Sequence, residues 1–216
     1  MNRIITRWYP AFLVAIAFGV SAAVLGRLPD QMVVHWDMAG NPNGWMSRSI
    51  GAFFAPFMML ASWAIFRAAP HIDPRRENFQ KFAGSYDFIV AAILTLLLVI
   101  HLAVLALALG YHVNIGLIAP MLVGILFVVI GNVLPLARPN FMYGIRTPWT
   151  LSNDRVWART HRFGGYSMTI AGLAMIAASI LLPSELGVAV VIGASVASLL
   201  APAVYSYLTW KRETKR

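Results

Sequence analysis

The chain has 216 residues, of which 59% are hydrophobic and only 12% are charged, and its net charge is +9. Because soluble domains usually carry about 25% charged residues, this composition excludes an ordinary water-exposed surface and indicates an integral membrane protein. A membrane-spanning helix needs about 20 residues, so the length allows roughly six spans and no large soluble domain. The absence of cysteine excludes disulfides and thiolate metal sites.

Six apolar segments follow one another along the chain, and each is close to the length that crosses a bilayer. They cover residues 8–25, 50–69, 86–109, 115–136, 163–182 and 187–207. The first is predicted to be a retained helix, because Leu25 is not followed by the small-residue pattern of a signal-peptide cleavage site. The sequence therefore predicts an all-α, polytopic membrane bundle of about six transmembrane helices.

Three regions are expected within this bundle. They are a two-helix unit at 8–69 with an outside loop at 27–49, a third helix at 86–109, and a three-helix region at 115–208 with an inside loop at 137–162. Small residues recur four apart at Gly165 and Thr169, and again at Gly193, Ala197 and Ala201. This spacing predicts close approach of helices, within the bundle or between two copies.

The basic residues indicate the orientation. If the N-terminus is inside, 15 of the 17 Lys and Arg residues fall in inside segments, and only Arg27 and Arg48 fall outside. Short cytoplasmic loops carry such an excess, so both termini are predicted to be cytoplasmic. The net charge is then explained by loops that lie beside anionic lipid, and direct nucleic-acid binding is not expected.

The outside loop at 27–49 carries one candidate site. Residues 33–38 can form an extended piece, and residues 40–44 are rich in turn formers. His35 and Asp37 would share one face of a strand, while Trp45 can sit at the membrane surface. Two ligands do not make a zinc site, which needs at least three protein ligands. A lid held by hydrogen bonds is therefore favoured over a metal or catalytic site.

The inside loop at 137–162 is richer in unusual residues. Pro139 stiffens the exit from the fourth span, Gly144 is expected to supply a turn, and Thr147 should be extended because it precedes Pro148. Ser152 or Asn153 can cap a short helix at 154–162, on which Trp157 and His161 lie four apart on one face. The loop is interpreted either as an interfacial element on lipid phosphates or as a folded site for a partner or anionic ligand. The candidate residues for the second interpretation are Asn132, Arg138, Asn140, Arg146, Thr147, Trp149, Trp157, His161 and Arg162.

The motif from Gly131 to Gly165, with Gly-Ile-Arg-Thr-Pro-Trp-Thr-Leu at its centre, closely resembles the SdpI family of bacterial membrane proteins. The outside loop, with His-Trp and Gly-Asn-Pro-Asn-Gly-Trp, resembles a domain of unknown function that often precedes that family in the same chain. The resemblance implies a six-helix protein of the bacterial inner membrane. It further implies protection against a secreted killing peptide outside, and a repressor held at the membrane inside.

Three functions are weighed on this basis. The leading hypothesis is a non-enzymatic immunity or signalling protein against a peptide toxin or envelope stress, with membrane lipids and a second copy of the chain as further candidate partners. The second is a small transporter or channel, for which intramembrane His101 and Asp87 near the end of the third helix are the candidate polar residues. The third, an enzyme on a lipid phosphate, lacks an HExxH motif, paired carboxylates and a serine elbow. No cofactor or metal is expected.

Overall fold

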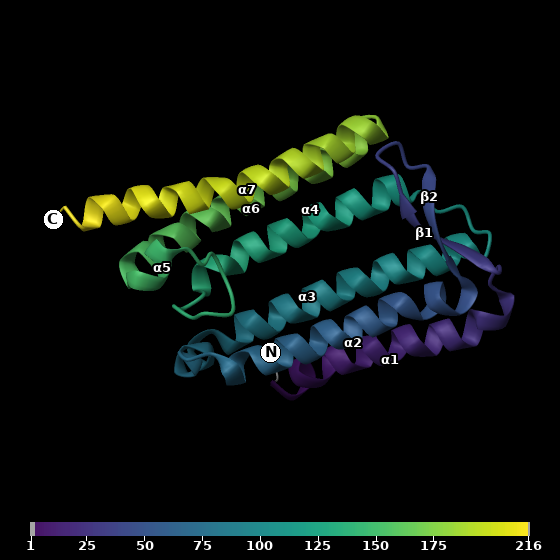
Figure 1. Cartoon of the computed structure of the whole chain (residues 1–216), viewed down its shortest axis with the longest axis horizontal. Coiled ribbons are helices and arrows are strands. Elements are labelled where there is room, and N and C mark those ends of the chain that lie inside the picture. Colours follow the sequence, from purple (N-terminus) through teal and green to yellow (C-terminus); the bar gives the residue numbers. More distant parts are fainter. Residues whose placement is uncertain (1–2, 216) are drawn as a thin grey trace.

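The computed structural model describes residues 3–215, with side chains from Trp8 onward, and its elements form two groups of helices joined by α3 and α4 (Figure 1). The α-helices are α1 (Arg3–Val24), α2 (Arg48–Ile72), α3 (Arg76–Ala108), α4 (Ile115–Val133), α5 (Pro148–Ser152), α6 (Asp154–Leu181) and α7 (Ser184–Glu213). Short 3-10 turns, η1 (Leu25–Arg27) and η2 (Leu134–Leu136), follow α1 and α4. Strands β1 (Gln31–Trp36) and β2 (Pro42–Ser47) pair antiparallel between α1 and α2.

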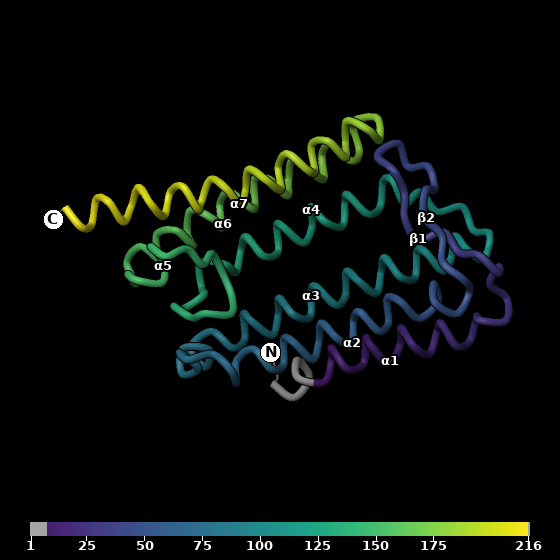
Figure 2. Tube along the Cα trace, in the orientation of Figure 1, coloured from purple at the N-terminus to yellow at the C-terminus, as the bar shows by residue number. Residues whose placement is uncertain are grey.

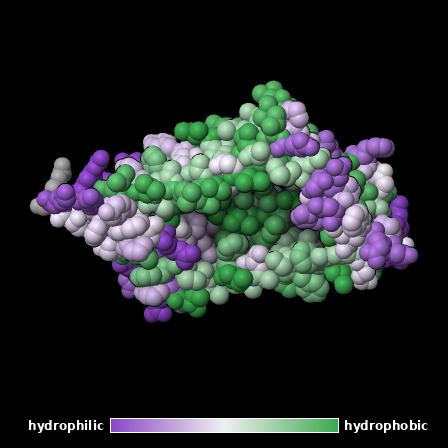
Figure 3. Space-filling model, turned by 45° about the horizontal axis from the view of Figure 1, so that its top comes forward, coloured by the Kyte–Doolittle hydropathy of each residue, from purple (hydrophilic) through white to green (hydrophobic). Residues whose placement is uncertain are grey.

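Six of the described helices are long and apolar enough to cross a membrane. Figure 3 shows the matching surface, with an apolar middle and hydrophilic residues gathered at the two ends. These observations confirm the predicted all-α bundle, and the chain is a multi-pass membrane protein. We call the end that carries β1 and β2 the hairpin end, and the end that carries α5 and the 137–153 loop the loop end (Figure 1).

Two of the predicted helix boundaries are wrong. The third span begins at Arg76 rather than at residue 86, and it runs through a single non-helical residue, Phe82. The short helix predicted at 154–162 is not separate from the fifth span, because both belong to the continuous helix α6. The predicted start at Asp154 is correct, since the Asn153 side chain accepts the backbone N–H groups of Arg155 and Val156 and so caps the helix.

The six spans form two groups of three, which the Cα trace in Figure 2 separates clearly. Helices α1, α2 and α3 pack on one another, and α6 packs between α4 and α7 in the second group. The first group has a core of large side chains, with Met59 and Leu94 fully buried. In the second, a Cβ on Gly172 would lie 2.5 Å from the carbonyl oxygen of Gly124, so helix backbones touch there.

The hairpin is anchored to the first group of helices. Met32 of β1 is fully buried and packs in a cluster with Leu28, Ala52 and Leu105. Gly51 of α2 makes room for it, because a Cβ there would lie 3.1 Å from Met32. The extended piece predicted around residues 33–38 is confirmed in part as β1, whereas the second strand, β2, was missed, since its Pro-Asn-Gly start was taken for turn sequence.

Candidate functional site

The 137–153 loop at the loop end is built around Asn140, which is completely buried. Its side-chain oxygen accepts the backbone N–H groups of Met142 and Tyr143, and its amide nitrogen donates to the carbonyl of Arg138. All three hydrogen bonds are local, so the Asn140 side chain satisfies backbone groups that regular secondary structure would otherwise pair. Asn140 therefore determines the shape of the turn, and it is not available to a partner.

Trp157 and His161, predicted to share one face of a helix, stack with their ring centroids 4.0 Å apart. The indole N–H of Trp157 donates to the carbonyl of Ala137 at 2.9 Å. His161 accepts the backbone N–H of Ile145 at Nε2, so its proton sits on Nδ1, which faces the carbonyl of Trp157. Both rings are buried, and together they tie the start and the middle of the loop to α6.

Gly144 lies directly against the imidazole ring of His161. Its φ is +105°, a left-handed conformation that glycine adopts without strain. A Cβ at this position would also collide with the imidazole Nε2. The turn predicted at Gly144 is thus confirmed, and the structure adds a second reason for glycine there, the close contact with His161.

Thr147 begins the short helix α5. It is extended before Pro148 as predicted, and it forms a capping box with Thr150. The Thr147 hydroxyl lies 2.9 Å from that of Ser206 on α7, which joins the loop to the last helix. Trp149 is half-buried and packs against Tyr207 with ring centroids 5.0 Å apart. Helix α5 itself was not predicted, since five residues are too few to show a helical periodicity.

A second set of contacts joins the loop to the first group of helices. The carboxylate of Asp73, 3% exposed, accepts the backbone N–H of Phe141 at 2.7 Å and that of Arg75 at 2.6 Å. Arg75 also donates to the carbonyl of Leu151, and Asn78 donates to the carbonyl of Pro139. We call Asp73, Arg75 and Asn78, with their partners in the loop, the latch. Sequence reasoning missed it because its members are distant in the chain.

Tyr143 extends the latch into the core of the first group. Its ring lies 6.0 Å from that of Phe82 and 5.9 Å from that of Tyr86, centroid to centroid. Burial raises the pKa of the Tyr143 phenol well above its ordinary value. The phenol is therefore neutral at physiological pH, and the loop is held by packing as well as by hydrogen bonds.

Apart from the half-buried Trp149, the candidate residues of the inside loop thus separate into two sets. Asn140, Trp157 and His161 are buried and shape the loop, with Thr147 in the same network. Four others are exposed on the surface: Asn132, Arg138, Arg146 and Arg162. Arg146 also donates to the carbonyl of Phe141. Arg138 and Arg146 lie within residues 137–153, which contain no acidic residue. The exposed face of the loop is therefore basic and suits an anionic group.

The hairpin residues make a compact turn of their own. The Asp37 carboxylate accepts the N–H groups of Ala39 and Asn41, at 2.9 and 2.8 Å. These hydrogen bonds, led by the one from Asn41, hold the pKa of Asp37 below its ordinary value. His35 bonds to the side chain of Asn43 at 2.6 Å, and Trp45 is 56% exposed. Among the described residues, no three His, Asp or Glu side chains could hold a metal ion together.

The intramembrane polar residues lie apart from the loop. His101 is 2% exposed in α3, and its Nε2 lies 2.9 Å from the hydroxyl of Ser21, which itself donates to the carbonyl of Ala52. These bonds join α3, α1 and α2. Asp87 lies toward the loop end of α3, beside a surface pocket that His71 and Arg76 also line. The two residues are in different places and do not form one path.

These features define a class: a six-span helical membrane protein with a hairpin at one end and a latched, basic loop at the other. The SdpI/YfhL protein family profile matches residues 137–206, and that of a domain of unknown function, DUF1648, matches residues 12–60. Immunity protein SdpI of Bacillus subtilis (strain 168) is 30% identical over 161 residues, 74% of each chain. The chain belongs to the SdpI family. No solved structure matches it.

Proposed function

We propose that this chain is a non-enzymatic immunity protein of the bacterial cytoplasmic membrane, which gives resistance to a secreted peptide toxin or a related envelope stress. The observation that carries the proposal is the 30% identity to an immunity protein over 74% of both chains. The two motif-rich regions lie at opposite ends of the bundle (Figure 1). This arrangement supports a division of labour, in which the hairpin meets the toxin and the basic loop meets a cytoplasmic partner such as a repressor.

The division of labour requires a definite orientation, with the loop end in the cytoplasm. The positive-inside rule supports it, because 12 of the 14 basic residues whose side chains the structure describes belong to segments at that end. The other three basic residues, Arg3, Arg7 and Arg216, lie outside the part of the chain whose side chains the structure describes. Because the chain has no cysteine, single cysteines at Asn41 and Ser152 would report the sidedness cleanly. A membrane-impermeant maleimide should label Asn41→Cys in intact cells and Ser152→Cys only after lysis; the reverse pattern would refute the orientation.

Immunity itself is tested by toxin dose. A strain that lacks the gene should be killed by a lower concentration of purified killing peptide than its parent, and a plasmid copy should restore the parent's threshold. Equal thresholds in both strains would show that immunity is wrong for this member.

The role of the loop is tested separately. Arg146→Ala removes an exposed guanidinium, and Trp149→Ala removes a half-buried ring that packs on Tyr207. Both variants should abolish partner signalling, with protein level and hairpin labelling unchanged. His71→Ala is a matched control, because His71 is exposed at the same end but outside the 137–153 loop. If both loop variants behave as the control does in the toxin and signalling assays, the loop is purely structural.

A further inference from the structure

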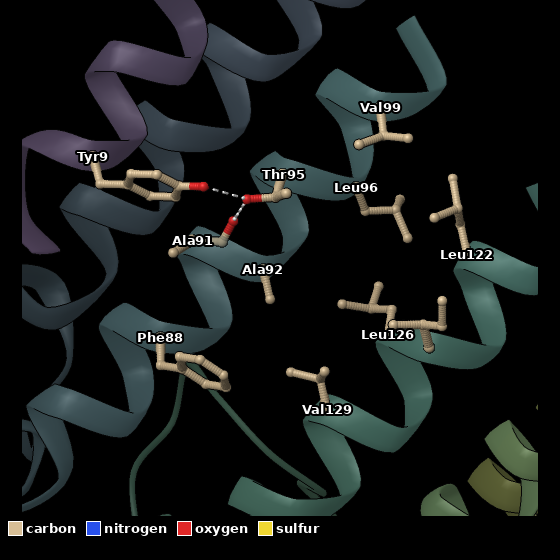
Figure 4. A pocket seen from close by; sticks show the side chains of 11 residues that line it. Tyr9, Phe88, Ala91, Ala92, Thr95, Leu96, Val99, Leu122, Leu126 and Val129 are labelled. Carbon is tan, nitrogen blue, oxygen red and sulfur yellow. Dashed lines mark hydrogen bonds between the residues drawn. The ribbon is translucent and has the colours of Figure 1, made fainter. Parts of the chain in front are cut away.

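A cleft separates the two groups of helices where α3 faces α4. Its volume is about 520 Å³, and its walls include Phe88, Ala92 and Leu96 of α3 and Leu122, Leu126 and Val129 of α4 (Figure 4). Figure 3 shows the corresponding apolar hollow between the two halves of the molecule. The cleft lies within the membrane-spanning parts of both helices, so the medium that faces it is the bilayer interior.

The two groups are held together at both ends of this cleft. At the loop end, the latch joins Asp73 to Phe141. At the hairpin end, the short connection from α3 to α4 links the two groups. Gly40 of the hairpin turn adds a second contact, because it approaches Gly116 at the start of α4. Between these points the α3 wall carries the small residues Ala91 and Ala92. The cleft therefore lies between two places where the groups of helices are joined.

The polar atoms on the walls do not form a binding site for water or ions, because they bond to one another. The Thr95 hydroxyl donates to the carbonyl of Ala91 at 2.8 Å, so the Tyr9 hydroxyl, 3.2 Å away, donates to Thr95. Figure 4 shows this pair at the edge of an otherwise hydrocarbon surface. An ordered water needs two to four polar partners, and the walls supply none beyond this internally satisfied pair. The occupant must be apolar.

The size of the cleft suits a slender apolar occupant. Ten residues of a helix about 10 Å wide would fill roughly 1,000 Å³, so the open cleft of about 520 Å³ could seat one face of a helix but could not enclose it. At about 30 Å³ for each small group, the share of a water molecule in its liquid, the space of 520 Å³ holds about 17 such groups. That is the scale of a single lipid acyl chain.

The charge of the residues at the loop end indicates which lipid headgroup would suit an acyl chain in the cleft. Tyr143 packs on Phe82 and Tyr86, which places the 137–153 loop beside the loop end of α3. This loop carries exposed Arg138 and Arg146 and no acid. On α4, Asn132 follows Val129 by three residues and is exposed, so it continues the cleft-facing row. Cationic and amide groups at the membrane surface complement an anionic phosphate.

We propose that the α3–α4 cleft binds one anionic phospholipid, with an acyl chain between Ala92 and Leu126 and its headgroup at Arg138 and Arg146. The lipid would fill the space that the latch and the hairpin keep open. This site does not depend on the immunity function, because it follows from the shape, chemistry and charge of the chain alone.

Native mass spectrometry of the full chain, released from micelles with phosphatidylglycerol or with phosphatidylcholine of the same acyl chains, tests the site. One phosphatidylglycerol should be retained per chain. Ala92→Phe, which fills the cleft, should lose it, while Ala174→Phe, at an exposed position of α6, should keep it. Equal retention by both variants, or no retained lipid, would overturn the proposal, as would a second copy or a peptide retained in its place.

Two further measurements keep the proposal testable if Ala92→Phe does not fold. A phosphatidylglycerol with a photoreactive group in its acyl chain should crosslink the unmodified protein within residues 88–99 and 122–129, and crosslinks spread evenly over the lipid-facing helices would refute a defined site. The double variant Arg138→Gln, Arg146→Gln should retain the two lipids equally. If it still prefers phosphatidylglycerol, the headgroup assignment is wrong.

Discussion

In the α1–α3 group, Met59 and Leu94 are completely buried among other large side chains, whereas in the group of α4, α6 and α7 the closest contacts run between glycine backbones. Gly131 lies against Gly165, and Gly124 against Gly172. Lipid tails are as apolar as leucine, so burial from lipid gives little driving force, and both groups rely on close packing. The first group packs closely through large side chains, and the second packs closely through glycines that let the helix backbones touch.

The two groups of helices should differ in how well they tolerate substitutions. A core of interlocking large side chains loses contacts when one is shortened, but its neighbours can shift to some extent. Two backbones in direct contact have no side chain that can move aside, so any added group must separate the helices. The second group, which carries the latched loop, is thus expected to be the less tolerant of the two.

The largest effect is expected for Gly172→Leu. The new side chain would meet the backbone of Gly124 and Val128, so the free energy of unfolding should fall by at least about 3 kcal/mol, at the upper end for overpacking. Unfolding by SDS titration in mixed micelles measures this. The control is Gly193→Leu, since nothing lies within 4 Å of a Cβ there. Equal losses would mean that the α4–α6 backbone contact is not what holds this group together.

A somewhat smaller loss is expected for Leu94→Ala in the first group. Leu94 is fully buried, and deleting its side chain should cost about 2–3 kcal/mol of unfolding free energy through lost contacts and the cavity left behind. Leu102→Ala, at a partly exposed position of the same helix, is the matched control in the same SDS titration. A Leu94 effect no larger than the control's would contradict a side-chain-packed core.

The latch between the groups comes next. Asp73→Asn replaces one acceptor oxygen by an N–H donor, so one of the bonds to Phe141 and Arg75 is lost, which should cost about 1–2 kcal/mol. Hydrogen exchange should rise in residues 137–147 before it rises in the spans. Asp154→Asn, which removes only the exposed ion pair with Arg75, should change little. Unchanged exchange in the loop would show that the latch does not hold it.

The smallest effect is confined to the hairpin. Because hydrogen bonds lower the pKa of Asp37 in the folded chain, their stabilisation is complete above the unfolded value near 3.8 and is lost as pH falls through the lowered folded value. Amide exchange at Ala39 and Asn41 should therefore rise only in acid. Asp37→Asn should remove this pH dependence while His35→Ala preserves it. An acid response that survives in Asp37→Asn would assign it to another group.

Local signals in the sequence predicted much of the fold. Hydrophobic length located all six spans, and Asn153, Gly144 and Thr147 were placed correctly because capping and turn preferences depend only on near neighbours. The pairing of Trp157 with His161 followed from helical spacing alone. The row of Gly165 and Thr169 does pack on α4, while Gly193, Ala197 and Ala201 are exposed rather than packed inside this bundle.

The sequence by itself determined the membrane class, the number of spans and the basic character of the loop, because composition and spacing carry that information without any long-range contact. Only the tertiary structure decided which loop residues are buried and which are exposed. It also joined Asp73 to Phe141, 68 residues away, and left the cleft between α3 and α4. These features depend on how two groups of helices meet, and such distances in space are not encoded in any one stretch of the chain.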